Sequence, residues 1–276
     1  MTSKWNYLPL TSDEKLAETE LAKEYAAVPP VSQLLAQRGI RTLEEAHKFF
    51  HPSLKDLHDP FLMPGMHQAV ARLNKAMGAK ERIMVYGDYD VDGTTAVALV
   101  YKYLLNYYSN MEYYIPTRYD EGYGISLRSI DYAASQGVKL IVILDCGIKA
   151  IDEISYAKSL GIDFIICDHH VPDDRLPDAV AILNPKMPGS PYPCPHLSGC
   201  GVGFKFMQAF ALSNGLSNHN ELESMLDLVA VSIAADIVPI IGENRVMAHY
   251  GLRRINSNPN LGLRSCLLYT SDAADD

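Results

Sequence analysis

The stretch that decides the fold is IMVYGDYDVDG, which occupies residues 83–93. Its first four residues are apolar, and a run of this kind is typical of a short buried strand. After the stretch, apolar residues recur at helical spacing from Val97 to Leu104, which predicts a helix over residues 94–107. The three aspartates therefore lie on a turn between a strand and a helix, where open α/β sheets bind their ligands.

These three aspartates, Asp88, Asp90 and Asp92, stand at every second position. Alternate residues of an extended segment point the same way, so we expect the three carboxylates to converge on one cation. A calcium loop of the EF-hand type is excluded, because it needs a helix before it and a glutamate at the twelfth position, where this chain has Leu99. A solvated acidic turn without a metal is the remaining alternative at this stretch alone.

The strand–helix rhythm continues along the chain. Fully apolar strands that alternate with helices predict an α/β fold, with a parallel β-sheet flanked by helices on both faces. The order of the strands in the sheet does not follow from this pattern. We expect strands at 83–86, 111–115, 139–144, 163–167 and 179–183, and helices at 94–107, 126–136, 149–160, 202–213 and 221–234.

Residues 1–80 have a different pattern, which predicts a mainly helical N-terminal extension. Thr42 and Glu45 stand at the spacing of a capping box, which marks the start of one of its helices. Prolines at 52, 60 and 64 predict an irregular passage before the last helix of this extension. We expect these helices at 11–25, 31–38, 42–50 and 66–77.

Composition limits the class of protein. The chain has 276 residues, of which 48% are hydrophobic and 21% charged, as in an ordinary globular protein. It has no apolar run of about 18 residues and no signal-peptide pattern, so we expect a cytoplasmic protein without a membrane partner. Its five cysteines form no C-x-x-C pair, which argues against a disulfide framework and a structural zinc site. A net charge of −9 disfavours a nonspecific coating of nucleic acid, although bound metal ions can attract an anionic substrate to an acidic site.

Polar residues follow two later strands of the predicted sheet. Asp145 follows one of them, Asp168, His169 and His170 follow the next, and Asp236 lies just past an apolar helix. Taken singly, such an aspartate can be a helix cap and such a histidine a packing residue. Taken together they share one edge of a parallel sheet, and several carboxylates with imidazole and no thiolate suit Mn²⁺ or Mg²⁺. Pairs of such ions activate water for displacement at phosphorus, so the residues predict a two-metal phosphoesterase.

Four motifs occur in order, namely GDYDVDG at 87–93, DCG at 145–147, DHH at 168–170 and AD at 235–236. In this set the chain resembles the DHH phosphoesterase superfamily. Within this superfamily, the chain most resembles the branch that is specific for single-stranded DNA. The resemblance covers roughly residues 30–264. The signs of that branch are the form D-Y-D-x-D-G, the stretch RYDEGYG at 118–124, SGCGVGFK at 198–205, RGI at 38–40 and DPFL at 59–62.

The resemblance implies a role for each matching residue. Asp145 would bridge two Mn²⁺ ions, and Asp88 would bind directly or through water. His170 would lie over the scissile phosphate, and Asp168 would orient a histidine. Arg118 would hold a phosphate, with a surface ion pair as the alternative. The implied metal ligands are Asp88, Asp90, Asp92, Asp145, His169 and Asp236. The implied catalytic residues are His170, Asp168 and Asp145. At a helix N-terminus, the implied phosphate contacts are Gly199, Gly201 and Gly203, and helix packing is the alternative explanation for these glycines.

The implied activity is a 5′→3′ exonuclease that hydrolyses single-stranded DNA to mononucleotides in DNA repair and recombination, using two Mn²⁺ ions or Mg²⁺ in their place. Single-stranded DNA would be the substrate, and a single-strand-binding protein and a RecQ-type helicase would be partners. Two alternatives stay open. One is a DHH phosphodiesterase acting on short oligonucleotides or cyclic dinucleotides, and the other is an inactive truncated binding module.

The last residues differ from the family pattern. Members of this branch continue into a substrate-closing domain and an OB-type DNA-binding domain, whereas this chain reads SCLLYTSDAADD at 265–276. That string resembles translated sequencing-adapter read-through, and we expect a non-native tail that ends a truncated gene. The predicted organisation is a helical extension over 1–80, a DHH phosphoesterase catalytic domain over 81–264 and the tail over 265–276.

Overall fold

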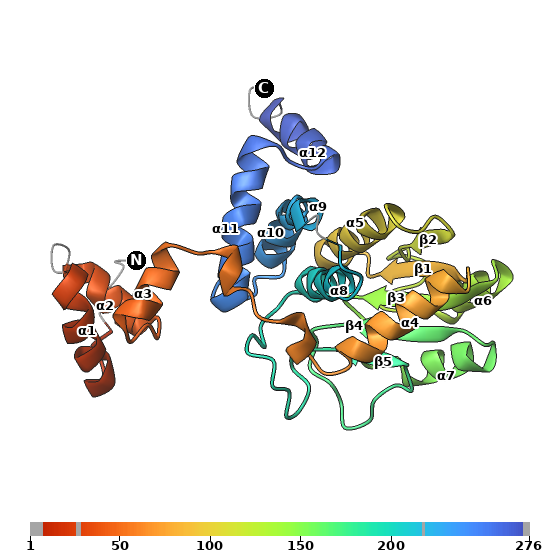
Figure 1. Cartoon of the computed structure of the whole chain (residues 1–276), viewed down its shortest axis with the longest axis horizontal. Coiled ribbons are helices and arrows are strands. Elements are labelled where there is room, and N and C mark those ends of the chain that lie inside the picture. The colour runs from red at the N-terminus through yellow and green to blue at the C-terminus, as the bar shows by residue number, and fades with distance from the viewer. Residues whose placement is uncertain (1–7, 26–28, 217–218, 273–276) are drawn as a thin grey trace, which may run out of the picture. The chain divides into compact units, whose positions relative to one another are not determined.

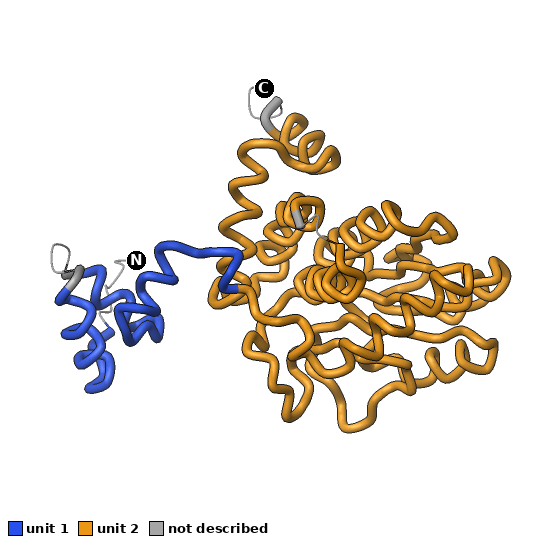
Figure 2. Tube along the Cα trace, in the orientation of Figure 1, with its two compact units in different colours: residues 1–56 blue, residues 57–276 orange. Residues whose placement is uncertain are grey.

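The computed structural model describes residues 8–25, 29–216 and 219–272, and the chain divides into two compact units, Met1–Asp56 and Leu57–Asp276 (Figure 2). The first unit contains the helices α1 (Ser12–Tyr25), α2 (Pro29–Gln37) and α3 (Leu43–Phe50). A small core of apolar side chains holds the three together. Its buried members are Ala17, Leu21, Leu35, Ala36 and Ala46.

The predicted capping box at the start of α3 is confirmed. The Thr42 hydroxyl accepts a hydrogen bond from the Glu45 amide at 3.2 Å, and the Glu45 carboxylate accepts one from the Thr42 amide at 3.1 Å. Helix α2 begins two residues earlier than predicted, because proline is tolerated in the first turn of a helix, where its missing N–H has no partner to lose.

The second unit is built on a five-stranded parallel sheet, which confirms the predicted α/β fold class (Figure 1). The strand order is β2-β1-β3-β4-β5. The chain leaves β1 for β2 on one side and returns to β3 on the other, so the carboxyl ends of β1 and β3 flank a topological switch point. The strands are β1 (Arg82–Gly87), β2 (Met111–Tyr114), β3 (Val138–Leu144), β4 (Asp163–Cys167) and β5 (Ala181–Leu183).

Helices cover both faces of this sheet (Figure 1). On one face, alternate strand residues such as Tyr86, Ile143 and Phe164 pack into a core with Ile130 and Ile154. Those two residues come from α6 (Leu127–Ser135) and α7 (Ile151–Ser159). The other face is covered by α4 (Met66–Gly78), α5 (Val91–Leu105) and α8 (Gly199–Ser213).

Helix α4 falls inside the part of the sequence predicted to be an N-terminal extension. It packs against β3, β5 and α8, and its buried face includes Ala69, Val70 and Leu73. The division between the compact units therefore lies before this helix, between Asp56 and Leu57, and not at residue 80.

Two helices begin earlier than the apolar pattern indicates, because polar residues cap them. Asp90 accepts a hydrogen bond from the Gly93 amide at 2.9 Å, so α5 begins at Val91. Ser198 accepts one from the Gly201 amide at 3.1 Å, so α8 begins at Gly199. The predicted helix at 221–234 is two helices, α9 (His219–Glu223) and α10 (Leu226–Ala235).

Two further helices follow, α11 (Gly242–Ser257) and α12 (Leu261–Asp272). Helix α12 contains the first residues of the segment predicted to be a tail, and residues 273–276 lie outside the described ones. All five cysteines are free thiols. Across the described ranges, no helix combines the length and apolar character needed to cross a bilayer.

Candidate metal centre

The acidic turn after β1 differs from the extended segment that the sequence predicts. Asp90 caps α5 and Asp92 lies in its first turn, so the expectation of three carboxylates on one extended face was wrong. Asp88 and Asp92 are buried, whereas Asp90 is exposed. The turn requires Gly93, because a Cβ there would lie 2.4 Å from the carbonyl oxygen of Asp88.

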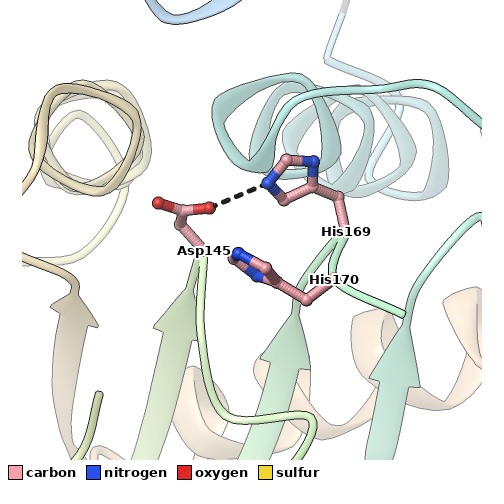
Figure 3. Close-up of side chains that lie close together, drawn as sticks. All are labelled: Asp145, His169 and His170. Atoms are coloured by element: carbon pink, nitrogen blue, oxygen red, sulfur yellow. Dashed lines mark ion pairs between the residues drawn. The ribbon is translucent and has the colours of Figure 1, made fainter. Parts of the chain in front are cut away.

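Asp145 ends β3 in a strained conformation. Its φ of 61° lies in the left-handed region, which is costly for a residue with a side chain and is found mostly at functional sites. The carboxylate is buried, and its Oδ1 atom lies 3.2 Å from Nε2 of His169 (Figure 3). Helix α8 abuts this carboxylate closely, since a Cβ on Gly199 would lie 2.5 Å from Oδ1 of Asp145.

The imidazole of His169 is where three carboxylates meet. Its Nε2 atom lies 3.2 Å from Asp145, 3.7 Å from Oδ2 of Asp92 and 3.6 Å from Oδ2 of Asp236. These acids come from the ends of β3 and α10 and from the first turn of α5, which the fold brings to one place. The sequence therefore predicted this convergence without the strand order.

Several buried polar atoms of this cluster make no hydrogen bond within the described residues. They are Oδ1 of Asp145, Oδ2 of Asp88 and both ring nitrogens of His169. Buried polar atoms nearly always have a partner, and a missing one calls for an explanation such as an ion. Carboxylate oxygens with one imidazole form a donor set that suits Mn²⁺ or Mg²⁺. The residues present therefore fit a divalent cation.

The electrostatics of the cluster agree with this donor set. Burial, together with the neighbouring charges of Asp92 and Asp90, raises the pKa of Asp145 to about 10. Burial also raises the pKa of Asp88 and of Asp92. Carboxylates crowded in this way are unfavourable as free anions, and a divalent cation among them would favour their charged forms.

The carboxylate of Asp92 is fixed by the start of α8. Its two oxygens accept hydrogen bonds from the amides of Gly199 and Cys200, both at 2.7 Å, and Oδ1 accepts a third from the Ser232 hydroxyl at 2.7 Å. The Ser232 oxygen also lies 2.6 Å from the Ser198 oxygen. When Asp92 is ionised it can only accept, so the one Ser232 proton goes to Asp92 and the Ser198 hydroxyl donates to Ser232.

These contacts change the role of the three glycines predicted to bind phosphate. The Gly199 amide donates to Asp92 and the Gly201 amide to Ser198, so neither is free for a substrate. At Gly203 a Cβ would lie 3.2 Å from the Val100 side chain, which indicates close helix packing. The geometry therefore favours helix packing over phosphate binding as the role of these glycines. Gly199 also holds the Asp92 carboxylate through its amide.

We expect Ser232→Ala to weaken Mn²⁺ binding roughly 10-fold, in the lower part of the range seen when a residue that orients a ligand is lost. The hydroxyl links α10, which carries Asp236, to the Asp92 carboxylate. Titration calorimetry with Mn²⁺ measures the effect, and Ser232→Thr should restore the affinity. Ser257→Ala, at an exposed serine near the end of α11, is the control. An unchanged affinity in Ser232→Ala would contradict this role.

His170 lies beside Asp145 and His169 (Figure 3), and Asp168 holds its ring. The Asp168 carboxylate lies 2.7 Å from Nδ1 of His170 and accepts hydrogen bonds from the amides of His169, His170 and Ile148. Burial alone would raise the pKa of Asp168, but these contacts outweigh it and lower that pKa. The hydrogen bond between the Asp168 carboxylate and Nδ1 of His170 raises the pKa of His170. Its Nε2 atom lies 3.3 Å from the Tyr123 hydroxyl.

Arg118 lies on the loop after β2 and is exposed. Its guanidinium stands 5.6 Å from the ring centre of Tyr89, in the acidic turn. Among the described residues it forms no ion pair, so the alternative of a surface ion pair is not observed.

Sequence reasoning gave Ser232, Ser198 and Tyr123 no role in the site, although Ser198 and Tyr123 lie in the quoted stretches 198–205 and 118–124. A signal for Ser232 was present in the sequence of α10. Apart from Asp227, Ser232 is the one polar residue in this apolar helix. No local signal pairs it with Asp92, since 140 positions separate the two residues.

The fold and this cluster define a class of protein. The family described as DHH family, N-terminal domain, matches residues 82–233, and the chain belongs to that family. Its curated relatives include the single-stranded-DNA-specific exonuclease RecJ of Bacillus subtilis, 40% identical over 247 residues, which cover 90% of this chain and 30% of the relative. The protein of the same name from Escherichia coli is 36% identical over 248 residues, which cover 86% of this chain and 42% of the relative. The resemblance seen in the sequence motifs is confirmed.

Solved structures give the same result. RecJ in complex with Mn²⁺ from Thermus thermophilus matches with a TM-score of 0.74 and 27% identity, covering 90% of this chain and 34% of the other. An exonuclease RecJ bound to manganese matches with a TM-score of 0.66 and 30% identity, covering 77% of this chain and 52% of the other. The chain spans less than half the length of the curated relatives cited above.

Proposed function

We propose that this chain is the metal-binding catalytic part of a single-strand-specific 5′→3′ DNA exonuclease, which hydrolyses phosphodiester bonds with two Mn²⁺ ions or with Mg²⁺ in their place. The observation that carries the proposal is the convergence of Asp92, Asp145 and Asp236 on Nε2 of His169. The names of the relatives support the substrate, and solved relatives in complex with Mn²⁺ and with Mg²⁺ support the ions.

Two overlapping groups of side chains would hold the ions. One group brings Asp145 to His169, with Oδ1 3.2 Å from Nε2, and the other is Asp92, His169 and Asp236, whose ligand atoms lie within 4.8 Å of one another. His170 lies beside the first group and is proposed to contact the phosphate instead of an ion. A carboxylate has two oxygens and can bind two ions. Among the three carboxylates around His169, that of Asp145 lies nearest to Nε2, so we assign the bridge to Asp145. Asp88 and Asp90 lie on the turn beside these groups and complete the proposed ligands.

When bound, the ions would supply an activated water and neutralise charge on the phosphate. The chain's own residues would position the substrate around them. Asp168 holds the His170 ring and favours its protonated form, which suits a group that stabilises charge on the phosphate. Arg118, stacked over Tyr89 in the acidic turn, is the proposed contact to a further phosphate.

The family resemblance also supports wider roles. They are DNA repair and recombination, a cytoplasmic location, and a single-strand-binding protein and a RecQ-type helicase as partners.

A substrate comparison tests the proposal. We expect Mn²⁺-dependent hydrolysis of long 5′-phosphorylated single strands to exceed that of dinucleotides, because the exonuclease must hold a strand while it removes mononucleotides. The assay compares initial rates on both substrates at equal concentrations of phosphodiester bonds, with chelator as the control. A preference for dinucleotides or cyclic dinucleotides would favour the alternative phosphodiesterase. Absence of hydrolysis on every substrate would favour the binding module.

A further inference from the structure

A pocket of about 450 Å³ opens beside the metal centre, next to His170. It lies between the loops that follow β2, β3 and β4, and it shares Asp168 and His170 with the site described above. The other side chains that matter for its chemistry are Tyr123, Lys149, Glu153 and Val171. No function described so far uses this pocket.

The pocket is connected to the reacting centre through Tyr123. The Tyr123 hydroxyl lies 3.3 Å from Nε2 of His170 and 3.5 Å from the carbonyl oxygen of Asp145. A group bound at the metal ions and a group in this pocket would therefore be close enough to belong to one small molecule.

The walls present apolar surface to solvent. The side chain of Tyr123 is 58% exposed and that of Val171 is 66% exposed, and both line the pocket. An aromatic ring on one side and a branched apolar side chain on another offer contacts to the faces of a planar ring. Stacking of nucleic-acid bases on aromatic side chains uses this kind of surface and tolerates any base.

The charges of the pocket argue against a second phosphate. Helix α7 begins here, and the acidic residues Asp152 and Glu153 in its first turn oppose the attraction that a helix N-terminus has for anions. The basic side chains in the lining, Lys149 and His170, each have an acidic partner that offsets their charge: Lys149 lies 3.2 Å from the Asp173 carboxylate and Nδ1 of His170 lies 2.7 Å from that of Asp168. An uncharged ligand suits this balance better than an anion does.

Glu153 adds a specific polar contact. Its side chain is half-buried in the lining, and its carboxylate has no hydrogen bond or ion pair with any residue that the structure describes. It can accept a hydrogen bond from an exocyclic amino group. An apolar wall with one free acceptor matches a nucleobase.

We propose that this pocket binds the base of the nucleotide whose phosphate lies at the metal centre. The inference rests on the proposed function, because it takes the phosphate to be at the ions. The sugar connects base and phosphate, so a nucleotide anchored by its phosphate would extend past His170 and Tyr123 into the pocket.

The test compares two probes that differ only in the base, 2′-deoxyadenosine 5′-monophosphate and 2-deoxyribose 5-phosphate, by titration calorimetry in the presence of Mn²⁺. We expect the nucleotide to bind roughly 10-fold more tightly, as one stacked base contributes. Glu153→Ala and Val171→Ala should each reduce this preference and leave the affinity for 2-deoxyribose 5-phosphate unchanged. Asp152→Ala is the matched control, since it removes an acid from the same helical turn but not from the pocket lining.

The outcomes separate the two proposals. Equal affinities for the probes, or a preference that survives in both pocket variants, would overturn the base pocket while Mn²⁺-dependent binding of the sugar phosphate still supports the metal centre. If neither probe binds in a Mn²⁺-dependent way, the proposed function fails and the pocket proposal fails with it.

Discussion

Asp145→Ala should abolish Mn²⁺-dependent hydrolysis, lowering the rate by a factor on the order of 10³ or more, because the proposed bridge between the ions is lost. The carboxylate stands between the acidic turn and His169, and no other described acid approaches that ring nitrogen as closely. A hydrolysis assay on single-stranded DNA measures the loss. Asp120→Ala, at an exposed loop position, is the control and should keep the wild-type rate.

The same substitution should change how stability depends on metal and on pH. At a Mn²⁺ concentration about 100 times the dissociation constant, the wild type should gain about 2.7 kcal/mol in its free energy of unfolding, and Asp145→Ala should gain much less. Without metal, the pKa of Asp145 is about 10 in the folded chain, against about 3.9 when unfolded. The folded state then binds the proton more tightly, so this group's contribution is fully present below about pH 4 and is lost as the pH rises towards about 10.

Thermal unfolding in the presence of chelator, measured at pH values between about 4 and about 10, tests the direction of this pH dependence. The wild type should lose stability as the pH rises, and Asp145→Asn should show a smaller slope. Hydrolysis at the wild-type rate by Asp145→Ala, or equal stabilisation of both proteins by Mn²⁺, would show that Asp145 binds no ion.

Lys205→Met should lower the free energy of unfolding by about 3–5 kcal/mol, the cost of leaving one partner of a buried ion pair alone. Lys205 on α8 and Glu243 on α11 are both fully buried, and Nζ lies 2.9 Å from Oε1. The Glu243 carboxylate also accepts hydrogen bonds from the Tyr192 hydroxyl and the His58 amide. This network holds together a loop, two helices and the segment before α4.

Urea unfolding measures this loss of stability. The double variant Lys205→Met/Glu243→Met should be much less destabilised than the single one, because replacing both charges by apolar side chains leaves neither unpaired. Lys158→Met is the control, since Lys158 forms an exposed pair with Asp178, and such pairs contribute about 1 kcal/mol or less. A single Lys205 variant as stable as this control would mean that the buried pair adds nothing to stability.

The central strands could be predicted because β1, β3 and β4 are mostly apolar runs between polar turns, and burial on both faces of a parallel sheet favours that pattern. The candidate metal ligands at the ends of these strands followed, since parallel strands share an edge. The start of α5 was missed, because the Asp90 cap contributes no apolar residue to the helical pattern.

Contacts between distant parts of the chain could not be predicted. Nothing local connects Asp92 with the Gly199 amide or with Ser232, and the Lys205–Glu243 pair appears in the sequence as two ordinary charges. Their partners are set by the way α8, α10 and α11 pack. For the same reason the glycines of α8 were assigned to phosphate, although Gly199 donates to Asp92, Gly201 donates to Ser198 and Gly203 packs against Val100.

The central claim is that Asp92, Asp145, Asp236 and His169 form one centre for two divalent ions. Counting the Mn²⁺ ions bound per chain, by titration followed with electron paramagnetic resonance, tests it most directly. We expect two bound ions in the wild type and the loss of both in Asp145→Asn. Two ions retained by Asp145→Asn, or no Mn²⁺ bound by the wild type at micromolar concentrations, would contradict it.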